Sequence, residues 1–195
     1  MSWRPVAARA ASLLLRYPDD AMLAAVPLII DALGELPVAV AGELRPVAAH
    51  RSATPAGTLR ADYVDTFDFR RRSAMHLTYY TCGDTRRRGE ALAGFAAEFK
   101  AAGYEVVDGE IPDHLPAVLD LAAVSEAGWR LLVSHRIGLD MLAESLNRSI
   151  YRHAVEAVRA MLPAPTADDL SAVATLARTG PPAEQVGLQP FGSSR

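Results

Sequence analysis

Apolar residues recur along nearly the whole chain at the spacing of an α-helix, and this periodicity limits the fold more than any other feature of the sequence. Each stripe at intervals of three and four residues marks one buried face of a helix. Such stripes run through residues 6–17, 22–33, 59–67, 92–99, 115–122, 131–146, 150–162 and 166–178. Residues 104–107 are the one short β-like run, and we expect a loop there. The sequence therefore predicts an all-α fold, a single-domain antiparallel helical bundle over residues 1–179.

Prolines and capping residues predict several helix ends. Thr54 and Pro55 have the residue types of an N-cap and of the first position of a helix. Asp84 or Thr85 is expected to cap the helix that carries the stripe at 92–99. Pro27 lies inside the second stripe, and we expect it to bend or split that helix because an interior proline forfeits a backbone hydrogen bond.

Three further features of the sequence predict a disordered tail, the absence of disulfides and the location of the protein. Residues 180–195 hold prolines, glycines and serines without a helical period, so we expect a disordered tail there. Cys82 is the only cysteine, and no internal disulfide is possible. The most apolar run, Ala21–Ile30, has ten residues, whereas a bilayer crossing needs about 18 to 20. We expect no transmembrane helix, no stable membrane insertion and a cytoplasmic protein.

Charge is unevenly distributed along the chain. Residues 45–88 carry nine Arg against four Asp, a net charge of +5, and the remaining residues carry 11 basic against 19 acidic side chains, a net charge of −8. The formal charge of the whole chain is −3, which gives no case for nucleic acid as a partner. Such asymmetry concerns partners rather than fold.

The sequence lacks the motifs of known catalytic and phosphate-binding sites. It has no Gly-x-Gly-x-x-Gly, P-loop, Gly-x-Ser-x-Gly or His-Glu-x-x-His. Its five histidines form no pair at i, i+4, so we expect no metal site and no cofactor. His135 lies in an apolar stripe and is expected to be a hydrogen-bonded core residue. We predict that the chain is not an enzyme; the open alternatives are an enzyme with an unfamiliar site and a helical regulator or nucleic-acid binder.

Residues 63–89 depart from the pattern of a simple bundle. The segment combines five aromatic residues with six arginines. Three of these arginines, Arg86, Arg87 and Arg88, fall in the first turn of a predicted helix, where the helix dipole opposes each cation by up to about 1 kcal/mol. Two interpretations are open. The arginines form either a solvated face screened by Asp84 and Glu90 or an edge that meets an acidic group of a partner.

Four stretches carry a resemblance to a known family: Tyr63-Val-Asp-Thr-Phe-Asp-Phe-Arg-Arg-Arg, Leu77-Thr-Tyr-Tyr, Gly83-Asp-Thr-Arg-Arg-Arg-Gly and Ile111-Pro-Asp-His-Leu-Pro. In this order they are similar to signature stretches of the nitrate reductase molybdenum cofactor assembly chaperones. This family is the NarJ type or delta subunit, within the TorD/DmsD/NarJ group of molybdoenzyme chaperones. The resemblance covers roughly residues 10–165 and is densest between residues 63 and 123. Cys82 departs from it, at a position where we expect a polar residue.

The resemblance implies a cytoplasmic, all-helical chaperone. Its partner would be the catalytic (alpha) subunit of respiratory nitrate reductase, bound transiently through an N-terminal peptide and kept competent for molybdenum cofactor insertion and assembly of the membrane complex. A regulator or peptide-binding adaptor for another molybdoenzyme is the alternative within this group. Among the matching positions, Gly83 and Gly89 are expected at a tight turn and a close helix contact. Asp84 is expected to act as a cap, and Asp113 as the N-cap of the helix through Leu119.

A chaperone of this kind is expected to hold a helical peptide in an apolar groove between helices. The candidates for the groove lining are Phe67, Leu77, Tyr80, Leu115 and Leu119, and further partner contacts are expected at Tyr63, Arg86, Arg88 and His114. The leucines can equally belong to the core. The tyrosines better suit a surface that is apolar at one end and wet at the other.

Overall fold

A computed structural model describes residues 2–69, 73–106 and 109–183 of the chain. Within these residues the structure contains eleven α-helices, one 3-10 turn and no strand, so the all-α prediction is confirmed. The helices are α1 (Trp3–Leu15), α2 (Asp20–Ala32), α3 (Val38–Ala53), α4 (Ala56–Phe67), α5 (Tyr79–Cys82), α6 (Arg86–Ala101), α7 (Leu115–Val124), α8 (Glu126–Ser134), α9 (Arg136–Ser145), α10 (Tyr151–Ala160) and α11 (Ala167–Thr179).

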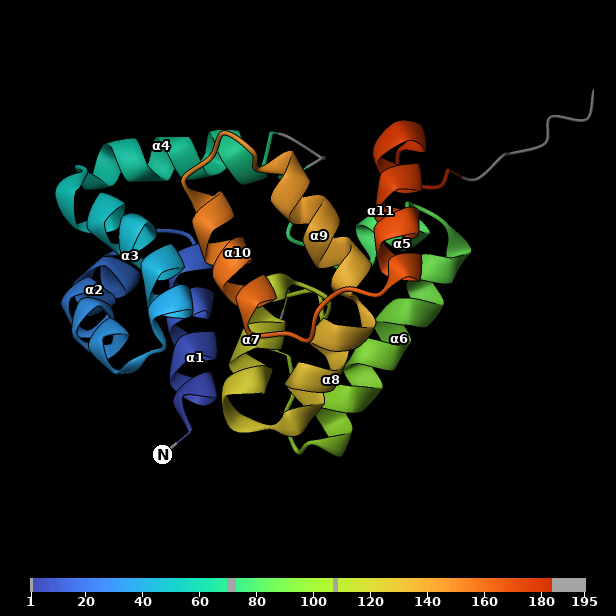
Figure 1. Cartoon of the computed structure of the whole chain (residues 1–195), viewed down its shortest axis with the longest axis horizontal. Helices are drawn as coiled ribbons and strands as arrows, with labels where there is room; N and C mark the ends of the chain where they lie inside the picture. Colours follow the sequence, from blue (N-terminus) through green and yellow to red (C-terminus); the bar gives the residue numbers. More distant parts are fainter. Residues whose placement is uncertain (1, 70–72, 107–108, 184–195) are drawn as a thin grey trace, which may run out of the picture.

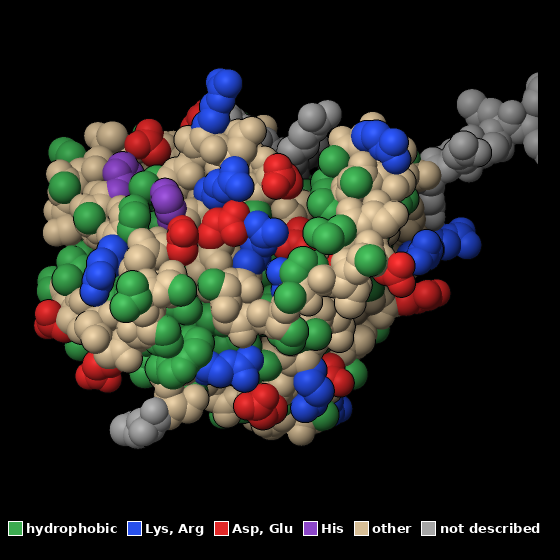
Figure 2. Space-filling model, viewed as in Figure 1, with side chains coloured by type: hydrophobic (Ala, Val, Ile, Leu, Met, Phe, Trp, Pro, Cys, Tyr) green, Lys and Arg blue, Asp and Glu red, His purple; other side chains and the backbone are tan. Residues whose placement is uncertain are grey.

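The helices fall into two groups on either side of a central layer (Figure 1). Helices α1 to α4 gather on one side, α5, α6 and α11 lie on the other, and α7 to α10 run between them. The most extensive packing joins α1 to α7 and α10 to α3, so helices far apart in the sequence close the core. Apolar side chains also reach the surface, and the largest apolar area on the face shown in Figure 2 lies over α1.

Helix α7 is the centre of the core. Seven of its ten residues are buried: Leu115, Pro116, Ala117, Val118, Leu119, Leu121 and Ala122. A helix that is apolar nearly all round can be stable only inside the protein. In contrast, α6 buries only two side chains, Phe95 and Phe99, and turns its other faces outward.

The structure changes three predictions about helix ends and interruptions. Pro27 does not split its helix, because α2 runs through it without interruption, and the alternative of a bend stays a prediction. Thr54 ends α3 instead of capping the next helix, its hydroxyl lies 3.2 Å from the Nδ1 of His50, and Pro55 is the N-cap of α4. Thr85 is the N-cap of α6 by position, but its hydroxyl donates to the carbonyl of Cys82 (2.8 Å) and makes no cap hydrogen bond.

The predicted long stripe over residues 131–146 is divided into α8 and α9 at His135. The ring nitrogen Nδ1 of His135 lies 3.0 Å from the carbonyl oxygen of Leu131, and the ring packs against Phe95 at 4.4 Å between centroids. His135 is thus hydrogen-bonded, as expected, but only half-buried. Helix α3 was not predicted, because Pro46 and polar residues interrupt its apolar pattern.

Asp113 does not cap α7, contrary to the prediction. His114 is the N-cap, and the buried carboxylate of Asp113 accepts hydrogen bonds from the backbone N–H of Thr78 (3.1 Å), the hydroxyl of Thr78 (2.5 Å) and His76 (2.9 Å). Burial by itself raises the pKa of Asp113, but these hydrogen bonds outweigh it and hold that pKa below its usual range. Asp113 therefore ties the segment that enters α5 to the segment that enters α7.

Of the two glycines with predicted roles, Gly83 has the predicted role and Gly89 does not. Gly83 has a φ of +59°, in the left-handed region that favours glycine, and forms the turn between α5 and α6 as predicted. Gly89 lies in α6 with open space around it, so the predicted close helix contact is wrong there. The close contact is made instead by Gly138 of α9, where a Cβ would overlap the backbone oxygen of Leu77.

Two further findings hold for residues 2–69, 73–106 and 109–183. No helix there combines the length and apolarity that a bilayer crossing requires. No three or more His, Cys, Asp or Glu side chains are grouped so as to hold a metal ion. Helix α11 ends at Thr179, and of the predicted tail, residues 184–195 lie outside the described residues.

Candidate functional site

The predicted apolar contacts lie in the core of this structure. None exposes more than 8% of its surface; they are Tyr63, Phe67, Leu77, Tyr80, Leu115 and Leu119. The aromatic rings of α4 pack on Tyr151 of α10, with Phe67 at 4.9 Å and Tyr63 at 5.8 Å between centroids. Burial raises the pKa of Tyr63 and of Tyr80. A direct contact with a partner at these six residues stays a prediction, and it would require the core to open.

The polar candidates are more accessible. Arg86 is exposed, and Arg88 is half-buried and forms an ion pair with Asp84 (3.3 Å). The N-cap position of α6 is held by Thr85 and not by Asp84, the residue for which a cap role was predicted from the resemblance. His114 is half-buried, with its Nδ1 at 3.0 Å from Glu110, and burial lowers its pKa. Its ring lies 5.4 Å from that of His76, so His114 adjoins the segment that leads into α5.

The structure gathers four of the nine predicted contacts at one side of the molecule. Leu77 and Tyr80 belong to α5 and the turn before it, and Arg86 and Arg88 begin the next helix, α6. Helix α9 packs against α5. Of the other candidates, Tyr63 and Phe67 lie on α4, and His114, Leu115 and Leu119 belong to α7 and its N-cap. The start of α7 is joined to the segment before α5 by backbone hydrogen bonds from Leu77 to Asp113 (3.1 Å) and from Leu115 to Met75 (2.8 Å).

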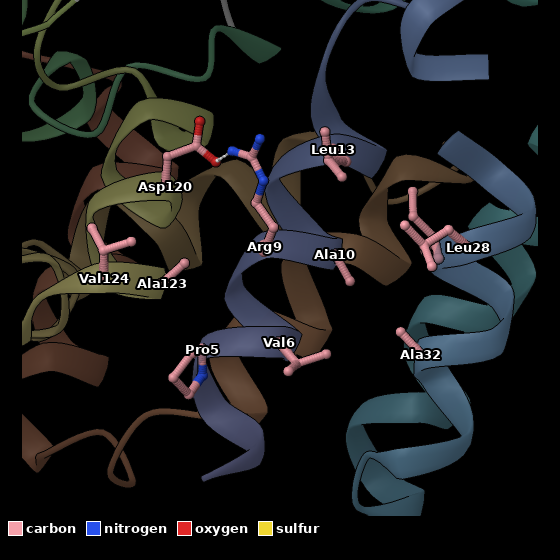
Figure 3. Close-up of a pocket in the computed structure, with 11 residues that line it drawn as sticks. Pro5, Val6, Arg9, Ala10, Leu13, Leu28, Ala32, Asp120, Ala123 and Val124 are labelled. Carbon is pink, nitrogen blue, oxygen red and sulfur yellow. Dashed lines mark hydrogen bonds and ion pairs between the residues drawn. The ribbon is translucent and has the colours of Figure 1, made fainter. Parts of the chain in front are cut away.

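An open apolar groove, which sequence reasoning missed, runs between α1, α2 and α7 (Figure 3). The groove has a volume of about 470 Å³, and its apolar lining includes Val6, Ala10, Leu13, Leu28 and Val124. Leu28 is 72% exposed and Val124 is 59% exposed. We call this surface the open groove. In α2, Ile29 is buried whereas Leu28 beside it is exposed, and the apolar pattern of the sequence does not distinguish the two.

An ion-pair ridge limits the open groove on the α7 side. Asp120 of α7 accepts from Arg9 (2.5 Å) and from Arg16 (2.6 Å), both on or just after α1. In Figure 3, Arg9 and Asp120 point toward each other while Val6 and Ala10 point toward α2. A second hollow of about 270 Å³, beside Tyr104 and Leu121, begins on the other side of this ridge.

A second surface lies under α11, and we call it the covered surface. Its floor includes Thr81 of α5 and Ile137 of α9, and the facing side of α11 presents Ser171, Ala172 and Leu176, among others. A hollow of about 450 Å³ remains between the two sides. None of the thirteen residues of α11 is buried. The covered surface adjoins Tyr80, which was predicted to line the peptide groove.

A sequence profile of the nitrate reductase delta subunit family matches residues 31–162, well over half of the chain. The chain belongs to this family. The profile match identifies it as a delta subunit homologue, in agreement with the resemblance carried by residues 63–123.

Three proteins from other organisms are similar to this chain over 120 to 170 residues. The Bacillus subtilis protein named probable nitrate reductase molybdenum cofactor assembly chaperone NarJ is 30% identical over 170 residues, covering 82% of this chain and 89% of that protein. Escherichia coli NarJ is 30% identical over 120 residues, 57% of this chain and 49% of that protein. The nitrate reductase-like protein NarX of Mycobacterium tuberculosis is 38% identical over 160 residues, and the chain spans only 24% of its length.

The stretch matched by the delta subunit profile includes α5 and α9 but not all of either surface. It contains Thr81 and Ile137, the floor of the covered surface, whereas α11 lies beyond it. In the open groove, the whole α1 wall and Leu28 precede residue 31. The floor of the covered surface is therefore the candidate site that the delta subunit profile contains.

Proposed function

We propose that this chain is an assembly chaperone for the catalytic subunit of a respiratory nitrate reductase. It binds that subunit transiently in the cytoplasm and keeps it competent for molybdenum cofactor insertion before the membrane complex assembles. The names of the Bacillus and Escherichia relatives support the assembly role. The chain acts by contact with its client, and we assign it no catalytic step and no cofactor of its own.

We further propose that the client's N-terminal peptide binds as a helix on the covered surface. One observation carries this assignment: an amphipathic helix, α11, already occupies a floor made by α5 and α9. Helix-in-groove recognition needs apolar anchors at i, i+3, i+4 and i+7 and a floor that accepts them. Ala172, Val173 and Leu176 of α11 have this spacing and are half-buried.

Arg86 and Arg88 are proposed to contact the client at the edge of the same surface. Both belong to the first turn of α6, directly after the Gly83 turn. Their charge lies at the positive end of the helix dipole, so an acidic group of the client would offset an unfavourable interaction. Replacing both by Glu should leave the fold intact and lower nitrate reductase maturation in cells. Unchanged maturation would leave the arginines as a solvated face.

Calorimetry with about the first twenty residues of the client catalytic subunit tests the assignment of the surface. We expect a dissociation constant in the micromolar to tens-of-nanomolar range, about −8 to −10 kcal/mol, because ordering the peptide offsets part of the gain. Ile137→Glu places a charge in the floor of the covered surface and should abolish binding. Leu28→Glu places the same charge in the open groove and should bind like the wild type.

The outcomes of this calorimetry separate the two surfaces and the two kinds of client. Loss of binding in Leu28→Glu with retention in Ile137→Glu would move the peptide to the open groove. An N-terminal peptide of another molybdoenzyme is the specificity control. Equal binding of that peptide would favour a general adaptor over a nitrate reductase chaperone. Absence of binding by the wild type at high peptide concentration would contradict the peptide-binding function itself.

A further inference from the structure

We propose that α11 is an exchangeable cover, which occupies the client surface in cis and is displaced by the client's helix. The inference rests on the proposed function, because it assigns the peptide and α11 to the same floor. Four features of α11 support it: its self-contained ends, its shallow attachment, the hollow it leaves and the turn it covers.

The ends of α11 are satisfied within the segment itself. The hydroxyl of Thr166 accepts from the backbone N–H of Asp169 (3.1 Å), and the carboxylate of Asp169 accepts from the backbone N–H of Thr166 (2.9 Å). This reciprocal capping box satisfies donors that would otherwise need partners from the body of the protein. Gly180, with a φ of +75°, ends the helix. Lifting α11 from the surface therefore leaves these terminal hydrogen bonds in place.

The attachment of α11 to the body is shallow. The helix buries no residue, and its packing is against α9. The linker from α10 contains Pro163 and Pro165, and Arg136 donates a hydrogen bond to the carbonyl of Pro163. The linker is thus fixed at its start, and α11 is held beside its surface by a short tether. A short tether gives an effective concentration in the millimolar range, so even weak intrinsic contacts keep the surface covered.

The side chains of α11 fill its floor poorly. Ser171, Ala172 and Thr175 are small, and the hollow of about 450 Å³ lies between them and the floor residues Thr81 and Ile137. Ligand pockets commonly have volumes of about 300 to 1,000 Å³. A helix with larger apolar side chains at the same positions would remove more apolar surface from water and would bind more tightly than α11. This difference in buried apolar surface allows a free peptide to displace the tethered helix.

The segment after α11 also lies on the turn that precedes the arginines. A Cβ at Gly83 would overlap the backbone oxygen of Pro182, so Pro182 lies directly against the Gly83 turn. This turn leads into the first turn of α6, which carries Arg86 and Arg88. Displacement of α11 would therefore uncover the apolar floor and the turn beside the arginines in one step.

Two pairs of variants in the full-length chain test the inference in opposite directions. Val173→Asp with Leu176→Asp places charges on the inward face of α11 and should release it. The matched control, Leu170→Asp with Ala174→Asp, places the same charges on the outward face, where Leu170 is 56% exposed. If α11 leaves the surface uncovered in about one molecule in ten, the inward pair should bind the client peptide about 10-fold more tightly than the wild type, and the control should not.

The second pair fills the hollow instead of releasing the helix. Ala172→Leu should tighten α11 on its floor and weaken peptide binding several-fold, whereas Ala174→Leu, on the exposed side, should leave it unchanged. Circular dichroism of each variant checks that the fold is kept. Equal affinities in the inward pair, its control and Ala172→Leu would overturn the inference while leaving peptide binding intact. Absence of binding in every form would instead remove the proposed function, and the cover with it.

Discussion

The open groove and the covered surface are both largely apolar, but they differ in how far their side chains are exposed to solvent. In the open groove, Leu28 and Val124 remain exposed at 72% and 59%. On the other side of the molecule, Thr81 and Ile137 lie beneath α11, a helix that buries none of its own residues. Exposed apolar surface invites non-specific association. A surface that stays covered until a more tightly binding helix replaces the cover avoids this risk. Such a surface becomes available only when α11 is displaced.

The two surfaces also differ in what holds their walls. The ridge of the open groove is an exposed ion pair, Arg9 with Asp120, which is duplicated by Arg16. The floor of the covered surface depends on a close backbone contact at Gly138 and on the buried carboxylate of Asp113. Substitutions on the covered side should therefore change stability much more than those at the ridge.

The largest effect is expected at Gly138. An alanine Cβ would overlap the backbone oxygen of Leu77, so α9 and the turn before α5 must move apart. We expect Gly138→Ala to lower the free energy of unfolding by about 2 to 3 kcal/mol. Gly94→Ala is the control, because nothing lies within 4 Å of the added Cβ, and it should raise stability by about 0.5 to 1 kcal/mol. Urea unfolding measures both; equal effects would show that the contact is not tight.

Asp113→Asn should produce the next largest effect. The substitution removes a buried charge that accepts from Thr78 and His76. Hydrogen bonds to charged groups contribute about 1.5 to 3 kcal/mol, so we expect a loss near 2 kcal/mol in urea unfolding. Asp84→Asn, which affects an exposed pair with Arg88, should change stability by less than about 0.5 kcal/mol. A loss as small for Asp113 would contradict its role as the tie into α5.

A smaller effect is expected from pH. The pKa of His114 is lowered by burial, so the folded state binds fewer protons there than the unfolded state. The free energy of unfolding should then fall as pH drops below about 6.5, the unfolded pKa of histidine. His114→Gln should flatten this dependence between pH 7 and 5 without abolishing it, since the pKa of His135 is lowered too. Unfolding curves at several pH values measure the slope; an unchanged slope would remove His114 as its source.

The smallest effect is expected at the ridge of the open groove. Arg9→Gln leaves Arg16 paired with Asp120 and should change the free energy of unfolding by less than about 0.5 kcal/mol. Binding of the client peptide should also stay unchanged. A clear loss of affinity in Arg9→Gln, measured by calorimetry, would mean that the open groove takes part in client binding.

Much of the fold could be predicted because local pattern and tertiary packing agree. The stripe at 115–122 is buried along α7, and the stripe at 150–162 forms α10. Prediction failed where the contacts of a single side chain determine the local structure. His135 divides a continuous apolar stripe into two helices. Asp113 was expected to cap the helix that follows it, but its hydrogen-bond partners come from residues 76–78. Buried Arg51 donates to the carbonyls of Leu14 and Arg16, a long-range contact without a sequence signal.

The site was less predictable than the fold for a physical reason. An apolar residue in a helical stripe has the same pattern in the core and in a groove, so Leu77, Leu115 and Leu119 could not be separated by sequence. The open groove arises from three helices whose approach is fixed only by tertiary packing. The covered surface depends on how α11 folds back past Pro163 and Pro165, which the sequence pattern does not specify.

Amide hydrogen exchange with and without the client peptide tests directly whether the peptide displaces α11. If the peptide takes the place of α11, exchange should slow in α5 and α9 and quicken in α11, because the displaced helix loses its packing. The α1, α2 and α7 walls of the open groove should keep their exchange rates. Slower exchange in those three helices, with α11 unchanged, would contradict displacement of α11 and place the client in the open groove.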